Sequence, residues 1–209
     1  MKKQLVLFVA PFVFFACKGD GARKAQGVTE PDTQTEIGEG QLHSADAYRE
    51  KGMEYAMAVQ AALGKTLQRK IKEEGTQGAI EFCNLKALAI TDSLSQELGA
   101  NISRITDRPR NPQNRAAAEE MKFISNFRSE LSTRQTPEAL IVRQENRTNF
   151  YYPIVTNQLC LQCHGTRENK ITPEVYSKLQ ELYPEDQAVG YSSDQLRGLW
   201  KVSFPEEQP

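Results

Sequence analysis

The chain has 209 residues, of which 39% are hydrophobic and 25% are charged, and its formal net charge at pH 7 is -1. A chain of this length can bury enough apolar surface to stabilise a core, so the composition predicts one folded domain. The near-neutral charge gives no support for nucleic-acid binding or for a strongly acidic partner.

The first segment of the chain has the pattern of a secretion signal. Lys2 and Lys3 precede an apolar run over residues 5–15, which is too short for a permanent membrane-spanning helix, and Cys17 follows. We therefore expect residues 1–16 to be a signal peptide and Cys17 to accept a lipid, as in bacterial lipoproteins, with ordinary cleavage nearby as the alternative. Both outcomes export the protein. Lipidation would place it in the periplasm or at the cell surface, anchored to a bacterial membrane through the lipid alone.

Residues 17–43 separate this signal from the first periodic segment. Beyond the cysteine they are rich in Gly, Thr and Glu and show no apolar periodicity, which is typical of a flexible tether. The folded domain is therefore predicted to span residues 44–209.

Two helices are predicted at the start of this domain. Ser44 is a suitable N-cap, and apolar residues then recur at helical spacing until Gly75. Thr76 is a suitable cap for a second helix, whose apolar face ends at Gly99. The short connection predicts an antiparallel hairpin or a bent pair.

The middle of the chain alternates short segments of different types. Residues 100–107 are predicted to form a strand, and the two prolines within residues 108–114 require a loop. Asn114 is a suitable cap for a third helix over residues 116–131, in which three apolar residues are expected to face inward: Met121, Ile124 and Phe127.

Further strands and one more helix are predicted in the last third. Residues 139–142 and 149–155 have strand-like composition, and the polar residues between them predict a hairpin. Thr172, followed by proline, marks the start of a helix, and residues 199–204 close the chain as a strand. Helices combined with a small antiparallel sheet define the α+β class.

The chemistry of the chain is concentrated in the motif Cys160-Leu161-Gln162-Cys163-His164. The C-x-x-C-H spacing is the attachment signature of a c-type haem. Two thiols at this spacing can add across the two vinyl groups of one porphyrin, and the following histidine is then placed to ligate the iron. We predict one covalent haem c bound through Cys160, Cys163 and His164. Export agrees with this prediction, because haem c is attached in the exported compartment.

Other chemistries also use a C-x-x-C pair. A zinc site needs two more ligands, and beyond the N-terminus the chain offers only Cys83 and His43. A thioredoxin-like redox pair opens a helix in a βαβ unit, which the flanking sequence does not predict. A haem-free protein in which Cys160 and Cys163 form a disulfide is the third alternative.

The ligand on the other face of the iron would decide what the haem can do. The sequence offers His43, Cys83, a lysine, an open position, or one of three methionines: Met53, Met57 and Met121. Cys83 would be an odd thiol in an oxidising compartment, where an exposed thiol oxidises or cross-links. Burial in the core or ligation to iron would each protect it, and the residues alone leave both possibilities open.

Three arginines bracket the proline loop: Arg104, Arg108 and Arg110. Haem carries two propionates, and a guanidinium group pairs bidentately with a carboxylate. We expect one propionate contact among the three and take Arg108 and Arg110 as the candidate residues. The alternative is that they are surface arginines that anchor a turn.

Several features occur in a set order over residues 44–204: Cys83 on its helix, Arg108-x-Arg110-Asn111-Pro112-x-Asn114, Phe150-Tyr151-Tyr152-Pro153-Ile154, C-x-x-C-H-G, Gly190-Tyr191 and Leu196-Arg197-Gly198. This order resembles the PAS-like single-haem c-type cytochrome family. That family has long been catalogued as a domain of unknown function, and it occurs as stand-alone secreted proteins and as periplasmic sensor domains of histidine kinases. The resemblance implies a PAS-like α+β fold and an iron held by His164 and Cys83.

These predictions describe an exported monohaem c-type cytochrome with a His/Cys-ligated iron. A thiolate ligand stabilises ferric iron, so the expected role is redox or gas sensing, or low-potential electron transfer. Release of Cys83 would open a site for a diatomic gas such as NO or CO. The expected partner is a redox or signalling protein. The alternative is a haem enzyme, peroxidase- or nitrite-reductase-like, with an open sixth position.

Overall fold

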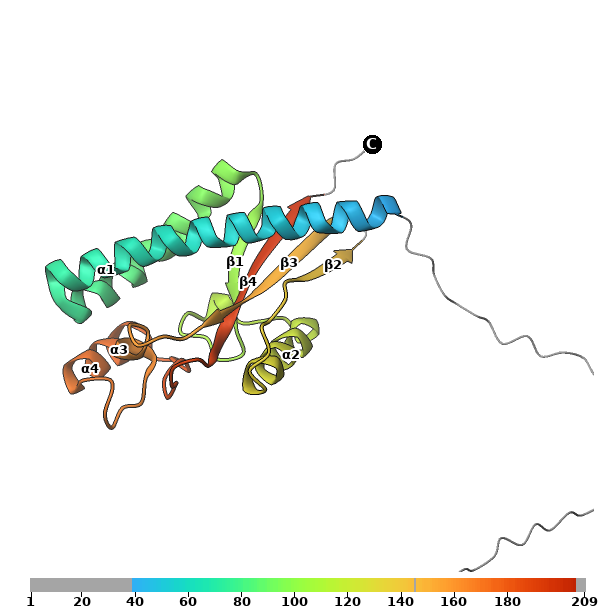
Figure 1. The fold of residues 1–209 in the computed structure, drawn as a ribbon. Helices are drawn as coiled ribbons and strands as arrows, with labels where there is room; N and C mark the ends of the chain where they lie inside the picture. The colour runs from blue at the N-terminus through green and yellow to red at the C-terminus, as the bar shows by residue number, and fades with distance from the viewer. Residues whose placement is uncertain (1–38, 145, 206–209) are drawn as a thin grey trace, which may run out of the picture. The chain divides into compact units, whose positions relative to one another are not determined.

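The computed structural model describes residues 39–144 and 146–205, with side chains from residue 45 onward (Figure 1). The predicted signal peptide over residues 1–16, the predicted lipidation site Cys17 and most of the tether lie outside the described residues, so these stay predictions. None of the helices described is both long enough and apolar enough to cross a bilayer.

The first element, α1 (Glu39–Leu98), is a helical hairpin with two arms. The arms meet at Gly75, whose φ of 72° and ψ of 179° break the helix, and Figure 1 shows the second arm running back along the first. Glycine adopts this positive φ without a Cβ penalty. The predicted hairpin is confirmed, but the helix begins at Glu39 rather than at Ser44. Ser44 therefore lies in the second turn instead of at the N-cap, because serine is also tolerated inside a helix.

The second arm ends in a glycine cap. Gly99 has a φ of 66°, its N–H donates to the Gln96 carbonyl at 3.3 Å, and the Ala100 N–H donates to the Ser95 carbonyl at 3.1 Å. This pair of bonds is a Schellman motif, which satisfies carbonyls that the helix end would otherwise leave unpaired. The predicted stop at Gly99 is confirmed.

The strands of the described chain form one antiparallel sheet in the order β1-β4-β3-β2. Their bounds are β1 (Asn101–Ile105), β2 (Leu140–Gln144), β3 (Arg147–Val155) and β4 (Leu196–Pro205). The predicted hairpin is β2–β3, with Gln144 opposite Arg147. The last strand pairs with both β1 and β3, so the C-terminal segment lies at the centre of the sheet. The predicted α+β class is confirmed.

Side chains alternate between the two faces of this sheet, as the pleat requires. The face toward α1 buries an apolar cluster that includes Val59, Phe150, Trp200 and Val202. On this face the indole N–H of Trp200 donates to Gln60 Oε1 of the first arm at 3.0 Å. The other face packs on α2 (Met121–Ser132) through a second cluster that includes Ile124, Phe127, Tyr151 and Leu199.

The segment before α2 departs from the prediction. Residues after the short helix η1 (Pro112–Asn114) are extended, because Ala116 N–H donates to the Thr106 carbonyl at 2.9 Å. Asn114 therefore caps no helix, and a second short helix, η2 (Ala118–Glu120), leads into α2. Ile124 and Phe127 face inward as predicted, whereas Met121 is 44% exposed. The helix begins later than predicted, and Met121 is its first residue.

The last third of the chain carries two short helices, α3 (Leu161–His164) and α4 (Pro173–Leu182). Thr172 caps α4 by accepting from the Val175 N–H at 3.4 Å, as the Thr-Pro pair predicts. In Figure 1 both helices lie beside the turn of α1. A third apolar cluster joins α4 to the second arm: Ile80, Ile171, Val175 and Leu179.

Candidate functional site

His164 closes the single helical turn α3, which follows Cys160. Its imidazole Nδ1 lies 2.7 Å from the carbonyl oxygen of Ala188. A carbonyl oxygen can only accept, so this contact places the proton on Nδ1 and leaves the lone pair of Nε2 free for a metal. Burial, reinforced by the positive charge of Arg110, lowers the pKa of His164 well below its ordinary value. The imidazole is therefore neutral at neutral pH.

The two cysteines of the motif are free thiols in the described structure. The Cys160 thiol donates to Asn157 Oδ1 at 3.3 Å, while Cys163 packs against the cluster that contains Ile80 and Leu179. Burial raises the pKa of Cys163 to about 11, so this thiol is protonated at neutral pH. The pair follows a strand of an antiparallel sheet, which is not the βαβ setting of a thioredoxin-like motif. In the described chain no group of three or more His, Cys, Asp or Glu side chains is arranged to hold a bare metal ion.

The second arm of α1 carries Cys83 to the same region. Thr76 Oγ1 donates to Gln162 Oε1 at 2.9 Å, so the arm touches α3. Asn84 Nδ2 donates to the Leu182 carbonyl at 3.4 Å, so the arm also touches α4. Cys83 lies between these two contacts in the sequence of the arm, and it is half-buried.

Cys83 lies close enough to the motif to interact electrostatically with Cys163. After the larger effect of burial, the interaction with the ionised form of Cys83 contributes to the raised pKa of Cys163. Burial also raises the pKa of Cys83 itself, while the positive charges of Arg104 and Arg110 oppose that rise. The structure thus brings Cys83 together with Cys163. Its ligation to iron stays a prediction.

The methionine and histidine candidates for the sixth ligand belong to other parts of the fold. Met53 and Met57 pack against the cluster under the first arm, and Met121 begins α2 on the other side of the sheet. His43 belongs to the first turns of α1, although its side chain lies outside the described residues. Figure 1 shows that α1 begins at the end of the hairpin far from α3. Of the cysteine, methionine and histidine candidates, Cys83 is the one that the fold brings to the motif.

Arg108 binds the backbone of the segment that orients His164. Its Nε donates to the Gln187 carbonyl at 3.1 Å, and its Nη2 donates to the Val189 carbonyl. The Gln187 N–H in turn donates to the Pro109 carbonyl at 3.0 Å. The proline loop and residues 186–189 are therefore held together on both sides of Ala188.

Arg110 holds residues 186–189 through Asp186, the first residue of that segment. Its guanidinium forms a buried ion pair with Asp186 at 2.9 Å and donates to the Cys163 carbonyl at 2.5 Å. The other oxygen of Asp186 accepts from the Ala188 N–H at 2.8 Å. Arg110 thus connects the haem-type motif to the residue whose carbonyl orients His164.

Arg108, Arg110 and Asp186 together form a clamp on residues 186–189, and the sequence did not predict it. The sequence predicts Arg108 and Arg110 as propionate ligands, and the structure shows that Nε and Nη2 of each are already bound to carbonyl oxygens or to Asp186. Their contact with a propionate stays a prediction. No sequence signal marks Ala188, because its contribution comes from the backbone.

The motifs Gly190-Tyr191 and Leu196-Arg197-Gly198 meet beside the histidine. The Tyr191 N–H donates to the His164 carbonyl at 2.9 Å, and the two ring centroids are 6.3 Å apart with planes at 84°. Arg197 Nη1 donates to Thr106 Oγ1 at 3.2 Å. Gly198 permits close strand packing, since a Cβ there would lie 2.5 Å from the Ile105 carbonyl oxygen.

Positive charge is concentrated around this site. Arg104, Arg110 and Arg197 all lower the pKa of His164, and Arg108 lies 4.5 Å from the centroid of the Tyr191 ring. Asp186 pairs with Arg110, and the other three guanidiniums have no ion pair among the described residues. The site therefore carries an excess of positive charge and suits an anionic ligand.

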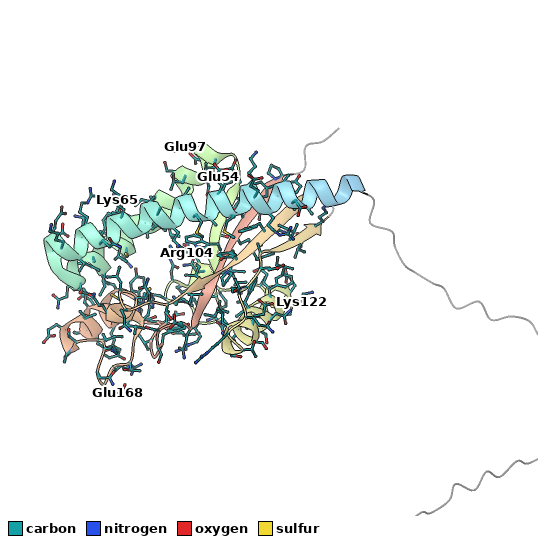
Figure 2. The ribbon with its side chains drawn as sticks, in the orientation of Figure 1. Glu54, Lys65, Glu97, Arg104, Lys122 and Glu168 are labelled. Carbon is teal, nitrogen blue, oxygen red and sulfur yellow. The ribbon has the colours of Figure 1, made fainter. Side chains whose placement is uncertain are left out.

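Arg104 is the least satisfied of these arginines. Arg104 lies on β1 opposite Trp200, so its side chain is on the face of the sheet that packs against α1. Figure 2 shows Arg104 beside the sheet, whereas Glu54, Lys65 and Glu97 lie on the outer side of α1. Within the described residues no hydrogen bond or ion pair is formed by its guanidinium. Burial lowers the pKa of Arg104, and the nearby Cys83 partly opposes this.

The fold and the site define an α+β domain in which a helical hairpin brings a third cysteine to a C-x-x-C-H motif. A model of the Tll0287-like family matches residues 36–205, and the chain belongs to that family. The fold is similar to that of the crystal structure of the cyanobacterial heme-protein Tll0287, with a TM-score of 0.56 and 20% identity over 82% of this chain and 99% of that chain. No curated protein matches the chain. The family resemblance drawn from the sequence is confirmed.

Proposed function

We propose that this chain is an exported c-type cytochrome with one haem, bound covalently through Cys160 and Cys163. Membership of the Tll0287-like family and the fold shared with a haem protein support the cofactor. The site residues fit it in three respects. The two thiols are free, His164 presents Nε2, and unpaired guanidiniums suit the two propionates. When bound, the haem supplies a one-electron iron couple.

The observation that carries this proposal is the contact between His164 Nδ1 and the Ala188 carbonyl at 2.7 Å. Histidines that ligate metals commonly donate their other ring N–H to a carbonyl or a carboxylate, which fixes both tautomer and ring orientation. Here the clamp formed by Arg108, Arg110 and Asp186 holds that carbonyl in place. The imidazole is thus oriented by the protein itself.

Cys83 completes the proposed ligand set. Its position on the second arm, near Cys163 and Arg104, supports this proposal, in which Cys83 would bind the iron as a thiolate. A thiolate donates electron density to ferric iron, so a low reduction potential is expected. Such a protein suits low-potential electron transfer, or sensing in which Cys83 leaves and a diatomic gas such as NO or CO enters. A haem enzyme would need an open position, which a bound Cys83 would close.

The decisive experiment is optical and electron paramagnetic resonance spectroscopy of protein made in cells that mature c-type cytochromes. We expect a Soret band that survives denaturation, a low-spin ferric signal with thiolate character, and slow or absent CO binding while Cys83 is bound. A colourless protein would refute the proposal. A high-spin ferric spectrum with rapid CO binding would instead favour the haem enzyme.

Export and anchoring are tested separately. Cys17→Ala should move the protein from the membrane fraction to the soluble periplasmic fraction without changing its absorbance spectrum. If the protein with Cys17 is already soluble, the lipid anchor is wrong while the haem proposal stands. In either role, transfer or sensing, the proposed partner is a redox or signalling protein that meets the chain outside the cytoplasm.

A further inference from the structure

Two buried polar atoms beside the histidine have no hydrogen-bond partner among the described residues. They are the hydroxyl oxygen of Tyr191 and the Nε of Arg197. Tyr191 is only 3% exposed. A buried polar group without a partner is costly, and the cost is larger for a charged group. Two unpartnered donors beside the same histidine indicate that an acceptor is present there in the haem-bound protein.

These two groups belong to one local arrangement. The guanidinium carbon of Arg197 lies 5.6 Å from the centroid of the Tyr191 ring, and that of Arg108 lies 4.5 Å from it. Tyr191 is itself fixed to the histidine turn through its N–H and the His164 carbonyl. Both donors are therefore held next to His164 by contacts that do not use the atoms in question.

The rest of the Arg197 side chain is already satisfied. Its Nη1 donates to Thr106 Oγ1 and to the Arg108 carbonyl, both at 3.2 Å. Burial lowers the pKa of Arg197 to about 10, so the guanidinium remains charged at neutral pH. An acceptor for Nε is thus best supplied by an anion, since a charge-assisted hydrogen bond also compensates the buried charge.

We propose that the Tyr191 hydroxyl and Arg197 Nε together bind one carboxylate, a propionate of the haem. This assignment rests on the proposed function, and it transfers the propionate contact from Arg108 and Arg110 to two residues of the C-terminal segment. A phenol and a guanidinium N–H can each donate to one carboxylate. Arg108 and Arg110 then act as positioning residues, because their donors hold residues 186–189.

The test is resonance Raman spectroscopy of the loaded protein, in which the propionate bending band reports hydrogen bonds to the propionates. Tyr191→Phe removes only the hydroxyl, and Arg197→Lys keeps the charge but loses Nε. We expect the band to shift to lower frequency in both variants. Tyr151→Phe is the matched control, because its hydroxyl is buried on the other face of the sheet and bonds to Glu120 at 3.1 Å. It should leave the band unchanged.

A band that stays in place in both variants while the Soret band is retained would overturn the assignment. A shift seen only in Arg108→Lys or Arg110→Lys would restore the original candidates. Chemical unfolding gives an independent readout. If the hydroxyl binds a carboxylate, Tyr191→Phe should lower the unfolding midpoint of the loaded protein, whereas a raised midpoint would contradict the proposal. Absence of a Soret band in the unmodified protein would mark failure of the haem proposal instead.

Discussion

Replacing Arg110 by methionine tests whether charge holds the segment that orients His164. The Arg110 and Asp186 side chains are only 13% and 10% exposed, and their closest atoms are 2.9 Å apart. Methionine fills similar space but leaves the Asp186 carboxylate buried without its cation. Breaking a buried pair in this way costs about 3–5 kcal/mol. The Ala188 N–H still donates to Asp186, so we expect the lower end, about 3 kcal/mol, in the free energy of unfolding.

A double-mutant cycle isolates the interaction between the two side chains. Urea unfolding at pH 7 is measured for the unmodified protein, Arg110→Met, Asp186→Asn and the double variant. We expect the double variant to lose less stability than the sum of the single losses, by about 1.5 kcal/mol or more. Arg110→Lys should be intermediate, because lysine keeps the charge but not the planar fork that reaches both Asp186 and the Cys163 carbonyl.

The chain offers a matched control for this cycle. Arg128 and Asp107 form an ion pair at 2.6 Å, but Arg128 is 49% exposed. A surface pair of this kind contributes about 1 kcal/mol or less. If the coupling between Arg110 and Asp186 proves as small as that between Arg128 and Asp107, the argument that a buried charge pair fixes this segment is refuted.

Three further predictions concern the ligands and the sheet. Cys83→Ala should convert the low-spin ferric spectrum to a high-spin or His/water one, and an unchanged spectrum would remove Cys83 from the iron. Cys160→Ala with Cys163→Ala should abolish haem staining in a denaturing gel, whereas residual covalent stain would show attachment elsewhere. Burial alone would raise the pKa of Glu120, but hydrogen bonds from the Lys201 ammonium, the backbone and a tyrosine hydroxyl lower it overall. The stability from this carboxylate is therefore present above its ordinary pKa and lost as the pH falls through the lowered value. Glu120→Gln should cost about 2 kcal/mol at pH 7, with a penalty that shrinks below about pH 4 in acid unfolding curves; a penalty constant with pH would contradict the argument.

Local signals in the sequence predict the parts of the fold that depend on neighbouring residues. Gly75 and Gly99 end their helical segments because each adopts a positive φ, and Thr172 caps α4 through its own hydroxyl. The position of Asn114 could not be predicted in the same way. Its surroundings are set by the pairing of Thr106 with Ala116, a tertiary contact that overrides the capping preference of an asparagine.

In the candidate site, too, the residues marked by local sequence could be predicted and those set by tertiary contacts could not. The C-x-x-C-H spacing predicts Cys160, Cys163 and His164 as haem-binding residues, and the family resemblance adds Cys83 to that prediction. The clamp could not be found by this route, because Arg108 and Arg110 act on carbonyl oxygens that lie about 80 residues away in sequence and that carry no side-chain signature. A surplus of arginines near a haem motif suggests propionate binding from the sequence alone. The structure shows that some of these arginines serve the backbone instead.

The acceptor that orients the imidazole is a main-chain carbonyl, so no change of side chain at that position removes the oxygen itself. Every amino acid at position 188 supplies the same oxygen, so an alanine scan, which would skip Ala188 altogether, cannot detect its contribution. The orientation of His164 should instead be sensitive to substitutions of Asp186 and Arg110, because their side chains fix the position of that oxygen. Ala188 is itself fully buried, so larger side chains there would be disfavoured by packing rather than by loss of the acceptor. Loss of imidazole orientation should therefore be found in variants of Asp186 and Arg110.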